Sequence, residues 1–223
     1  MHDKGERVRH GDGETVRWYR KAADQGHVAA QCHLGLMYVN GQGVKQSDEE
    51  AVRWCRKAAD QGDADAQFNL GLMYANGQGV KQSDEEAVRW YQKAADQGHT
   101  SAQFNLGLMY EDGQGVSVKQ SDEEVARWYG KAADQGHADA QCNLGNMYKN
   151  GQGVRQSDKE AVRCYQKATD QGNAAAQFNL GLMYVNGQGV KQSDKEAVRW
   201  FQKAADQGDA GAQAQVDKIK NRS

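Results

Sequence analysis

The sequence contains no proline, and isoleucine occurs once, at Ile219. Strands favour β-branched and aromatic residues, whereas this chain is rich in alanine, glycine, glutamine, aspartate and lysine. A sheet protein is therefore a poor match to the composition. The length of 223 residues would accommodate one or two ordinary domains, so size alone excludes no class of function.

The chain also lacks a long apolar run and an excess of positive charge. No stretch approaches the roughly 20 apolar residues that span a bilayer, and the polar start, residues 1–7, is not followed by the apolar core of a signal peptide. The formal net charge of −2 provides no field that attracts phosphates. We therefore expect no nucleic acid partner, no membrane insertion and a cytoplasmic location. If a leader was removed, the location is periplasmic or secreted instead.

Internal repetition is what the sequence has in abundance. The tripeptide Asp-Gln-Gly recurs six times, ending at Gly26, Gly62, Gly98, Gly136, Gly172 and Gly208. The spacing is 36 residues except between Gly98 and Gly136, where Ser117-Val118 is inserted into a run that we interpret as a surface loop. A period of this length predicts a solenoid, in which each repeat buries its apolar face by stacking on its neighbours.

Each repeat predicts two helices, as residues 63–98 illustrate. Apolar side chains recur at helical spacing up to Asn76-Gly77, where a glycine can close the last turn. Ser83 then begins a capping box: its hydroxyl is expected to accept the N–H three residues on, while Glu86 reaches back to the Ser83 N–H. The second helix stops at Gly98. The predicted core positions are Ala66, Leu70, Met73, Tyr74, Ala87, Val88, Trp90, Tyr91, Ala94 and Ala95.

The residues from Ala66 to Tyr74, the turn Gly77-Gln78-Gly79-Val80 and the spacing of Ala87, Trp90, Ala94-Ala95 and Gly98 resemble the Sel1-like repeat, a relative of the tetratricopeptide repeat. The resemblance implies an all-α fold, a right-handed α/α solenoid of antiparallel helix pairs with a concave surface lined chiefly by the first helix of each pair. It also implies a non-enzymatic adaptor or scaffold for proteins, of a kind found in bacteria. Fold does not name the partner.

The alignment that this resemblance suggests divides the chain into three parts. Residues 1–26 form a polar tail and a lone helix of the second type, and residues 209–223 form a capping helix. Between them we expect five repeats, at 27–62, 63–98, 99–136, 137–172 and 173–208.

The four cysteines are few for this length and lack the CxxC spacing of zinc and redox sites. The cysteine-rich, secreted branch of the Sel1-like family has its bridging cysteines at other positions of the repeat. We therefore expect reduced thiols, although the pairs Cys32 with Cys55 and Cys142 with Cys164 each fall within one repeat and leave a disulfide open.

The remaining polar patterns predict no catalytic residue, cofactor or metal site. Gly-Gln-Gly-Val-Lys follows a helix rather than a strand, unlike a phosphate-binding loop. His27, His99 and His137 stand at helix starts, and the acidic pairs lie in first helical turns, where they complement the helix dipole. A hydrolase acting on a cell-wall or small-molecule substrate is the least favoured alternative, since it needs converging titratable groups.

A second apolar line on the first helix of each repeat is the candidate binding surface. Its asparagines carry both donors and an acceptor, which suits an extended peptide or a helix of a partner protein. Packing of the phenylalanines against the first helix of the next repeat is the alternative for those rings. The predicted partner-binding residues are His33, Leu36, Phe68, Asn69, Leu72, Phe104, Asn105, Leu108, Glu111, Asn143, Asn146, Lys149, Phe178, Asn179 and Leu182.

The two ends of the solenoid differ. The C-terminal helix places Ala212, Val216 and Ile219 at i, i+4 and i+7, which predicts a cap with a polar outer face. The helix near residues 14–24 has no first helix before it, so we expect Trp18 and Tyr19 to expose apolar surface. A homo-oligomer through this end, a fragment of a larger protein, or a self-assembling repeat module are the alternatives that follow.

Overall fold

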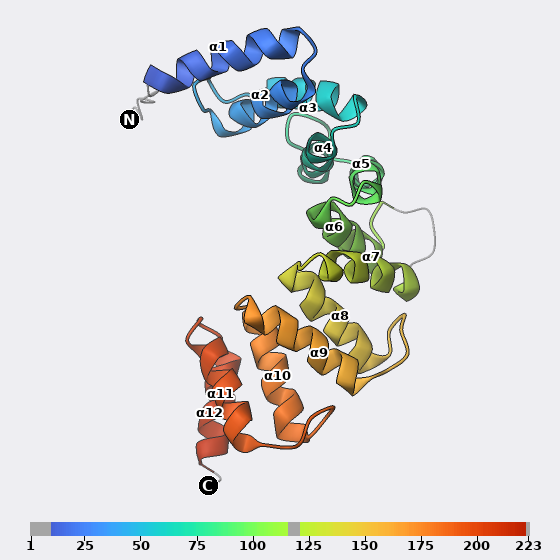
Figure 1. The fold of residues 1–223 in the computed structure, drawn as a ribbon, viewed down its shortest axis with the longest axis vertical. Helices are drawn as coiled ribbons and strands as arrows, with labels where there is room; N and C mark the ends of the chain where they lie inside the picture. Colours follow the sequence, from blue (N-terminus) through green and yellow to red (C-terminus); the bar gives the residue numbers. More distant parts are fainter. Residues whose placement is uncertain (1–9, 116–120, 222–223) are drawn as a thin grey trace. The chain divides into compact units, whose positions relative to one another are not determined.

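The computed structural model describes residues 10–115 and 121–221, with side chains from Gly13 onward. Within these residues the chain forms twelve helices and no strand (Figure 1). The inserted Ser117-Val118 lies outside the described residues. The helices are α1 (His10–Asp24), α2 (Val28–Asn40), α3 (Asp48–Asp60), α4 (Ala64–Asn76), α5 (Asp84–Asp96), α6 (Thr100–Glu111), α7 (Asp122–Asp134), α8 (Ala138–Asn150), α9 (Asp158–Asp170), α10 (Ala174–Asn186), α11 (Asp194–Ala205) and α12 (Ala210–Lys220).

Two compact units divide the chain, one of residues 1–109 and 113–119, the other of residues 110–112 and 120–223. Even-numbered helices are the first of each pair, here called A helices, and odd-numbered helices are the second, called B helices. Within each unit an A helix packs on the B helix that follows, as α2 does on α3 and α8 on α9 (Figure 1). A B helix also packs on the next A helix, as α3 does on α4 and α9 on α10. None of the helices in the described ranges is long and apolar enough to cross a membrane.

The predicted core of the repeat is confirmed in α4 and α5. Leu70, Met73, Trp90 and Tyr91 are buried, as are the alanines predicted beside them, while Tyr74 and Val88 are half-buried. In α12 the predicted stripe of Ala212, Val216 and Ile219 is buried against α11. Hydrophobic periodicity alone therefore located the faces that stack.

The two glycines of each Gly-Gln-Gly turn have different tasks. Gly77 adopts φ 68° and donates its N–H to the Met73 carbonyl, which closes α4 as predicted. Gly79 also has a positive φ, and a Cβ there would overlap the carbonyl of Asp48, in the first turn of the preceding B helix. The same approach recurs at Gly115, Gly153 and Gly189. The second glycine is therefore a stacking position between consecutive repeats.

The capping box is only half formed, which corrects the sequence prediction. Ser83 Oγ accepts the N–H of Glu86 at 3.3 Å, as expected. The Ser83 N–H, however, donates to the Tyr74 carbonyl at 3.0 Å, because the loop folds back on the end of α4. Glu86 instead forms an ion pair with Arg89 at 3.4 Å. The same backbone bond forms at Ser47, Ser157 and Ser193.

A buried glutamine connects neighbouring repeats, and the sequence pattern gave no indication of it. Gln67 is buried in α4, donates to the Ala59 carbonyl at the end of α3, and accepts from Gln97 at the end of α5. Gln31 and Gln141 make the equivalent pairs of bonds. Each glutamine therefore joins one A helix to the B helices on both sides, with the polar atoms satisfied.

Candidate functional site

A hollow of about 360 Å³ lies on the A-helix side of the first repeat, between α1 and α2. Three predicted residues, Tyr19, His33 and Leu36, line it. His33 is exposed and Leu36 is half-buried, so a ligand in the hollow would meet a polar ring and an apolar side chain. The structure thus brings together residues that the sequence assigned to two separate surfaces, the A-helix face and the N-terminal end.

The first and second repeats differ in the aromatic packing around their A helices. In the second repeat, Phe68 lies 5.9 Å from Tyr91 between ring centroids and stacks on His99 at 4.6 Å. The first repeat carries Cys32 and Cys55 at the corresponding positions, so it lacks those two rings. The aromatic packing that fills this side of α4 has no counterpart on α2.

Four residues of the hollow were missed by sequence reasoning: Thr15, Met37, Asn40 and Gln42. Asn40 and Gln42 flank the glycine that ends α2, so they were interpreted as part of the turn. Their side of the turn lines the hollow because α1 packs beside α2. A signal was present in Thr15, which stands where four of the other B helices have alanine and α7 has Val125.

The phenylalanines of the A helices are half-buried, and they pack on neighbouring helices. Phe68 contacts the two rings described above, and Phe178 lies 5.4 Å from Phe201 between ring centroids. Phe104 is half-buried as well. The alternative weighed from the sequence was packing on the next A helix. Of the ring partners, His99 stands just before the next A helix, whereas Tyr91 and Phe201 belong to B helices.

The asparagines of the A helices use part of their hydrogen-bonding capacity inside the protein. In the second unit, Tyr165 donates to Asn146 Oδ1 at 2.7 Å, and Asn179 donates to the same oxygen at 3.1 Å. Asn105 and Asn143 form hydrogen bonds with Tyr91 and Tyr129. These asparagines hold the buried tyrosine hydroxyls, and all are half-buried rather than exposed.

Three predicted residues of the second unit differ from their equivalents in the second repeat. Glu111 and Lys149 stand where that repeat has Ala75, and Asn146 stands where it has Leu72. Glu111 is exposed and accepts a hydrogen bond from the Tyr129 hydroxyl. Burial, together with the Glu111 carboxylate, raises the pKa of Tyr129. Lys149 is half-buried. Of the predicted set, the first unit holds His33, Leu36, Phe68, Asn69, Leu72, Phe104, Asn105 and Leu108, and the second holds Glu111, Asn143, Asn146, Lys149, Phe178, Asn179 and Leu182.

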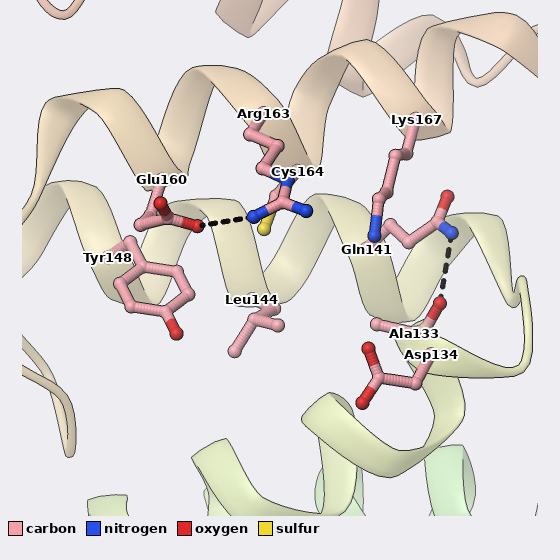
Figure 2. Close-up of a pocket in the computed structure, with 9 residues that line it drawn as sticks. All are labelled: Ala133, Asp134, Gln141, Leu144, Tyr148, Glu160, Arg163, Cys164 and Lys167. Atoms are coloured by element: carbon pink, nitrogen blue, oxygen red, sulfur yellow. Dashed lines mark hydrogen bonds and ion pairs between the residues drawn. The ribbon is translucent and has the colours of Figure 1, made fainter.

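A second cavity, of about 140 Å³, opens beside Cys164 in the second unit (Figure 2). Leu144 and Tyr148 of α8 face it from below, and Arg163, Cys164 and Lys167 of α9 face it from above in that view. Arg163 is paired with Glu160 at 3.7 Å. These lining residues lie on the side of α8 that packs on B helices, away from the predicted asparagine line.

The four cysteines are free and buried. Burial raises the pKa of the Cys32 and Cys55 thiols from 9.0 to about 12, with Asp63 adding a negative charge nearby. Burial raises the pKa of Cys142 and Cys164 to about 11. All four are therefore protonated near neutral pH, the opposite of an activated nucleophile. Within the described ranges, no three His, Cys, Asp or Glu side chains are grouped as metal ligands would be.

The outer side of α1 exposes one large apolar side chain. Trp18 is 72% exposed. Tyr19 differs from the expectation, because it is half-buried against the core of the first unit and lies 5.2 Å from His33 between ring centroids. The two neighbours therefore face different surfaces: Trp18 faces solvent, and Tyr19 lines the hollow.

Comparison with known proteins identifies the repeat. The Sel1 repeat model matches residues 1–27, 28–63, 64–99, 100–137, 138–173 and 174–209. No curated protein matches the sequence. The six segments matched by the Sel1 model include residues 1–27 as a repeat. Their boundaries lie one residue after those inferred from the glycine spacing.

Solved structures with the same fold include two that are more than 30% identical. One is c5321, described as a protective antigen of uropathogenic Escherichia coli strains displaying an SLR fold: it is 37% identical with a TM-score of 0.89 over 93% of this chain. This chain spans 44% of the length of c5321. A Sel1 repeat protein from Oxalobacter formigenes is 32% identical with a TM-score of 0.80, over 93% of this chain and 87% of that one.

A third structure shows likeness of fold alone. YrrB is described as a TPR protein with an unusual peptide-binding site, and it is 19% identical with a TM-score of 0.56, over 91% of this chain and 99% of that one. Together these structures are α/α solenoids of repeated helix pairs, which is the architecture of the present chain.

Proposed function

The chain belongs to the Sel1 repeat family, and on that premise we propose that it is a non-enzymatic scaffold whose A-helix face binds an extended segment of another protein. The hollow of about 360 Å³ beside His33 is the observation that carries this proposal. It is large enough for one or two side chains of a peptide, and its lining combines apolar and hydrogen-bonding groups.

The lining of the hollow suits a peptide backbone with one apolar anchor. Leu36, Met37 and Tyr19 offer apolar contact, while the Asn40 amide and the exposed His33 ring offer donors and acceptors. Extended peptides require both, because their main-chain N–H and C=O groups need partners while their side chains fill pockets. The peptide site named in the description of YrrB is a precedent on a similar fold, and it assigns no residue here.

The path of the peptide beyond the hollow would follow Asn69, Leu72 and Asn105 on α4 and α6. These side chains are half-buried and continue the A-helix face within the first unit. Phe68 supports them from beneath by stacking on His99. Removing Phe68 would therefore disturb the fold as well as the surface, and the smaller changes at Asn69 and Leu72 test binding more cleanly.

The test is to select peptides from a display library for binding to the full chain, and then to measure the affinity of one selected peptide for the chain and its variants. We expect the double variant His33→Ala, Leu36→Ala to bind the selected peptide about tenfold more weakly or worse, since a few central contacts carry most of the binding energy. Arg53→Ala is the matched control, because Arg53 is exposed on α3, where it pairs with Glu50 and lies over the Trp54 ring of the same helix. Equal binding by both variants, with both folded by circular dichroism, would overturn the assignment of the face.

A second function, self-association through α1, is favoured by one observation. Trp18 is the large apolar side chain that α1 exposes, and exposed apolar surface usually marks an interface. Under this alternative, sedimentation velocity would show a concentration-dependent dimer that Trp18→Ser abolishes, while Tyr19→Ser would affect the hollow instead. A monomer at all concentrations would leave the scaffold proposal standing and remove this one.

A further inference from the structure

The repeats themselves show what occupies the place where Cys164 stands. Four B helices from α3 onward carry tryptophan at that position of the repeat, at Trp54, Trp90, Trp128 and Trp200, whereas α9 carries Cys164 and α1 carries Trp18, which is exposed. The first three indoles are buried and the fourth is half-buried. A cysteine side chain is far smaller than an indole, so the cavity of about 140 Å³ beside it is the space that a ring would fill.

The charged groups that cover these indoles remain in place at Cys164. A lysine three residues on places its ammonium over each ring, 4.2 Å from the centroid at Trp54, 3.9 Å at Trp90, 4.2 Å at Trp128 and 4.3 Å at Trp200. The preceding arginine lies over the ring of Trp128 at 4.7 Å and of Trp200 at 5.6 Å. Lys167 and Arg163 occupy the same two positions around Cys164, and both line the cavity (Figure 2).

The cavity is open to solvent. The leucine that lies beneath it, Leu144, is half-buried, whereas the four leucines at the same position of other A helices are fully buried: Leu34, Leu70, Leu106 and Leu180. Tyr148 forms the side wall (Figure 2). The absence of the indole has therefore uncovered an apolar floor beneath two cations.

We propose that this cavity is a second binding site, distinct from the A-helix face, and that it receives an aromatic side chain, preferably the indole of a tryptophan, from a partner polypeptide. The ring would lie on Leu144, beneath the Lys167 ammonium and the Arg163 guanidinium. Cations attract the face of an aromatic ring, most strongly that of indole. A dry apolar cavity of about 150 Å³ accepts benzene. The present cavity, of about 140 Å³, is open to solvent and also has Asp134 and Glu160 in its lining, so it has room for one aromatic ring whose edge reaches the opening.

The site does not depend on the proposed peptide face. The lining residues belong to α7, α8 and α9, all in the second unit, and they lie on the B-helix side. The occupant is inferred from the four internal examples, in which the chain uses an indole to fill the same surroundings. A test that contradicts one of the two proposed sites therefore does not contradict the other.

The test is a titration of the full chain with N-acetyl-tryptophanamide, a tryptophan side chain between two peptide bonds, followed by NMR. We expect roughly millimolar affinity and shifts confined to Leu144, Tyr148, Cys164 and Lys167, since one ring with cation contacts supplies modest energy. Lys167→Met should weaken binding roughly two- to fivefold. Shifts elsewhere only, or none at all, would overturn the proposal.

Two variants control for the cavity. Cys164→Trp fills it with the indole that the other repeats carry, so binding should be lost and the melting temperature should rise. Cys142→Ala changes a buried thiol of the same repeat outside the cavity, and binding should persist. Binding that survives Cys164→Trp would contradict the assignment. Binding of free indole without binding of the capped tryptophan would show that a polypeptide side chain cannot enter, and would also overturn it.

The reciprocal variant keeps the proposal testable if Cys164→Trp does not fold. Trp200→Cys should create a second site of the same kind, because Lys203 and Arg199 already cover that ring within the second unit. The expected result is a second set of shifts around Leu180 and Tyr184. A folded Trp200→Cys variant that binds no additional ligand would contradict the internal analogy on which the site rests.

Discussion

At the scale of single residues, a glycine in the middle of α2, α4, α8 and α10 determines how closely the following B helix approaches. A Cβ on Gly71 would lie 2.6 Å and 2.7 Å from two ring carbons of Tyr91, and Gly145 and Gly181 face Tyr165 and Phe201 in the same way. In the first repeat the neighbour is the Sγ of Cys55, 2.5 Å from the added Cβ of Gly35. Close approach to a buried ring explains a glycine where helix propensity alone would favour alanine.

We predict that Gly71→Ala lowers the free energy of unfolding by about 1–3 kcal/mol, because Tyr91 must shift in a packed core. Gly130→Ala is the matched control: Gly130 lies inside α7 with nothing within 4 Å of the added Cβ. There the substitution should stabilise by about 0.5–1 kcal/mol through backbone entropy. Urea unfolding of the two variants measures both values, and equal effects would refute the packing explanation.

The buried thiols make stability depend on alkaline pH. Their pKa is raised by burial, for Cys32 and Cys55 from 9.0 to about 12, so the folded state holds these protons more tightly than the unfolded state. Stability is therefore complete below a pH of about 9 and falls as the pH rises toward 12. Melting temperatures measured across this range test the prediction. The Cys32→Ala, Cys55→Ala double variant should show a shallower decline, and an unchanged decline would assign it to other groups.

Sequence reasoning at this scale succeeded where the chemistry was local. The helix-start histidines are an example: His99 Nδ1 accepts the Ala102 N–H at 3.1 Å, as Asp63 does for Ala66 at 2.8 Å. It failed for Tyr19, which was expected to be exposed, because α2 covers part of that ring. The hollow at His33 was also invisible in the sequence, since it depends on side chains that come from two helices.

At the scale of the helical element, the start of each B helix depends on one serine. Ser83 caps α5 through its hydroxyl, and its own N–H bonds the Tyr74 carbonyl. Ser83→Ala should therefore cost about 1 kcal/mol, since only the hydroxyl is lost. Glu86→Ala should cost about 0.5 kcal/mol or less, because the Glu86 side chain has an exposed pair with Arg89 and the Ser83 N–H bonds the Tyr74 carbonyl instead of that side chain. Chemical denaturation of both variants decides between this arrangement and a complete capping box, for which the two losses would be similar.

Helix boundaries were predictable because glycine, serine and the apolar periodicity mark them within a few residues of sequence. The missing bond between Glu86 and the Ser83 N–H was not predictable. The acceptor that replaces Glu86, the Tyr74 carbonyl, lies nine residues before Ser83 and is brought near by the turn. The buried glutamines were missed for a related reason. Glutamine is usually exposed, and Gln67 is buried only because its partners arrive from two neighbouring B helices.

At the scale of the whole molecule, stability is shared between repeats and the interfaces between them. Gln67 is one such connection, and Gln67→Leu would leave the Ala59 carbonyl and the Gln97 amide without that partner. We expect a loss of about 1–3 kcal/mol and a broader unfolding transition, because a coupling between repeats is weakened. Gln92→Leu is the control and should change little, because Gln92 is half-buried and its side chain bonds Asp96 in its own helix. A transition as sharp as that of the unchanged chain would argue against the glutamine as a coupling.

The repeat architecture was the most predictable feature of the molecule, since a period of 36 residues has few explanations. The binding surfaces were less predictable, because they arise where a repeat departs from its neighbours. The hollow of the first repeat lies between α1 and α2 beside His33, and Cys164 lines the cavity on the B-helix side of the fourth repeat. Only the packing shows that space remains at these two places.

The central claim is that the A-helix face binds a segment of another protein, and an NMR map of a library-selected peptide on the full chain tests it most directly. The account predicts shifts that begin at Tyr19, His33 and Leu36 and continue along Asn69 and Leu72 in the first unit. Shifts confined to the exposed side of the B helices, around Arg53 and Arg89, would contradict it.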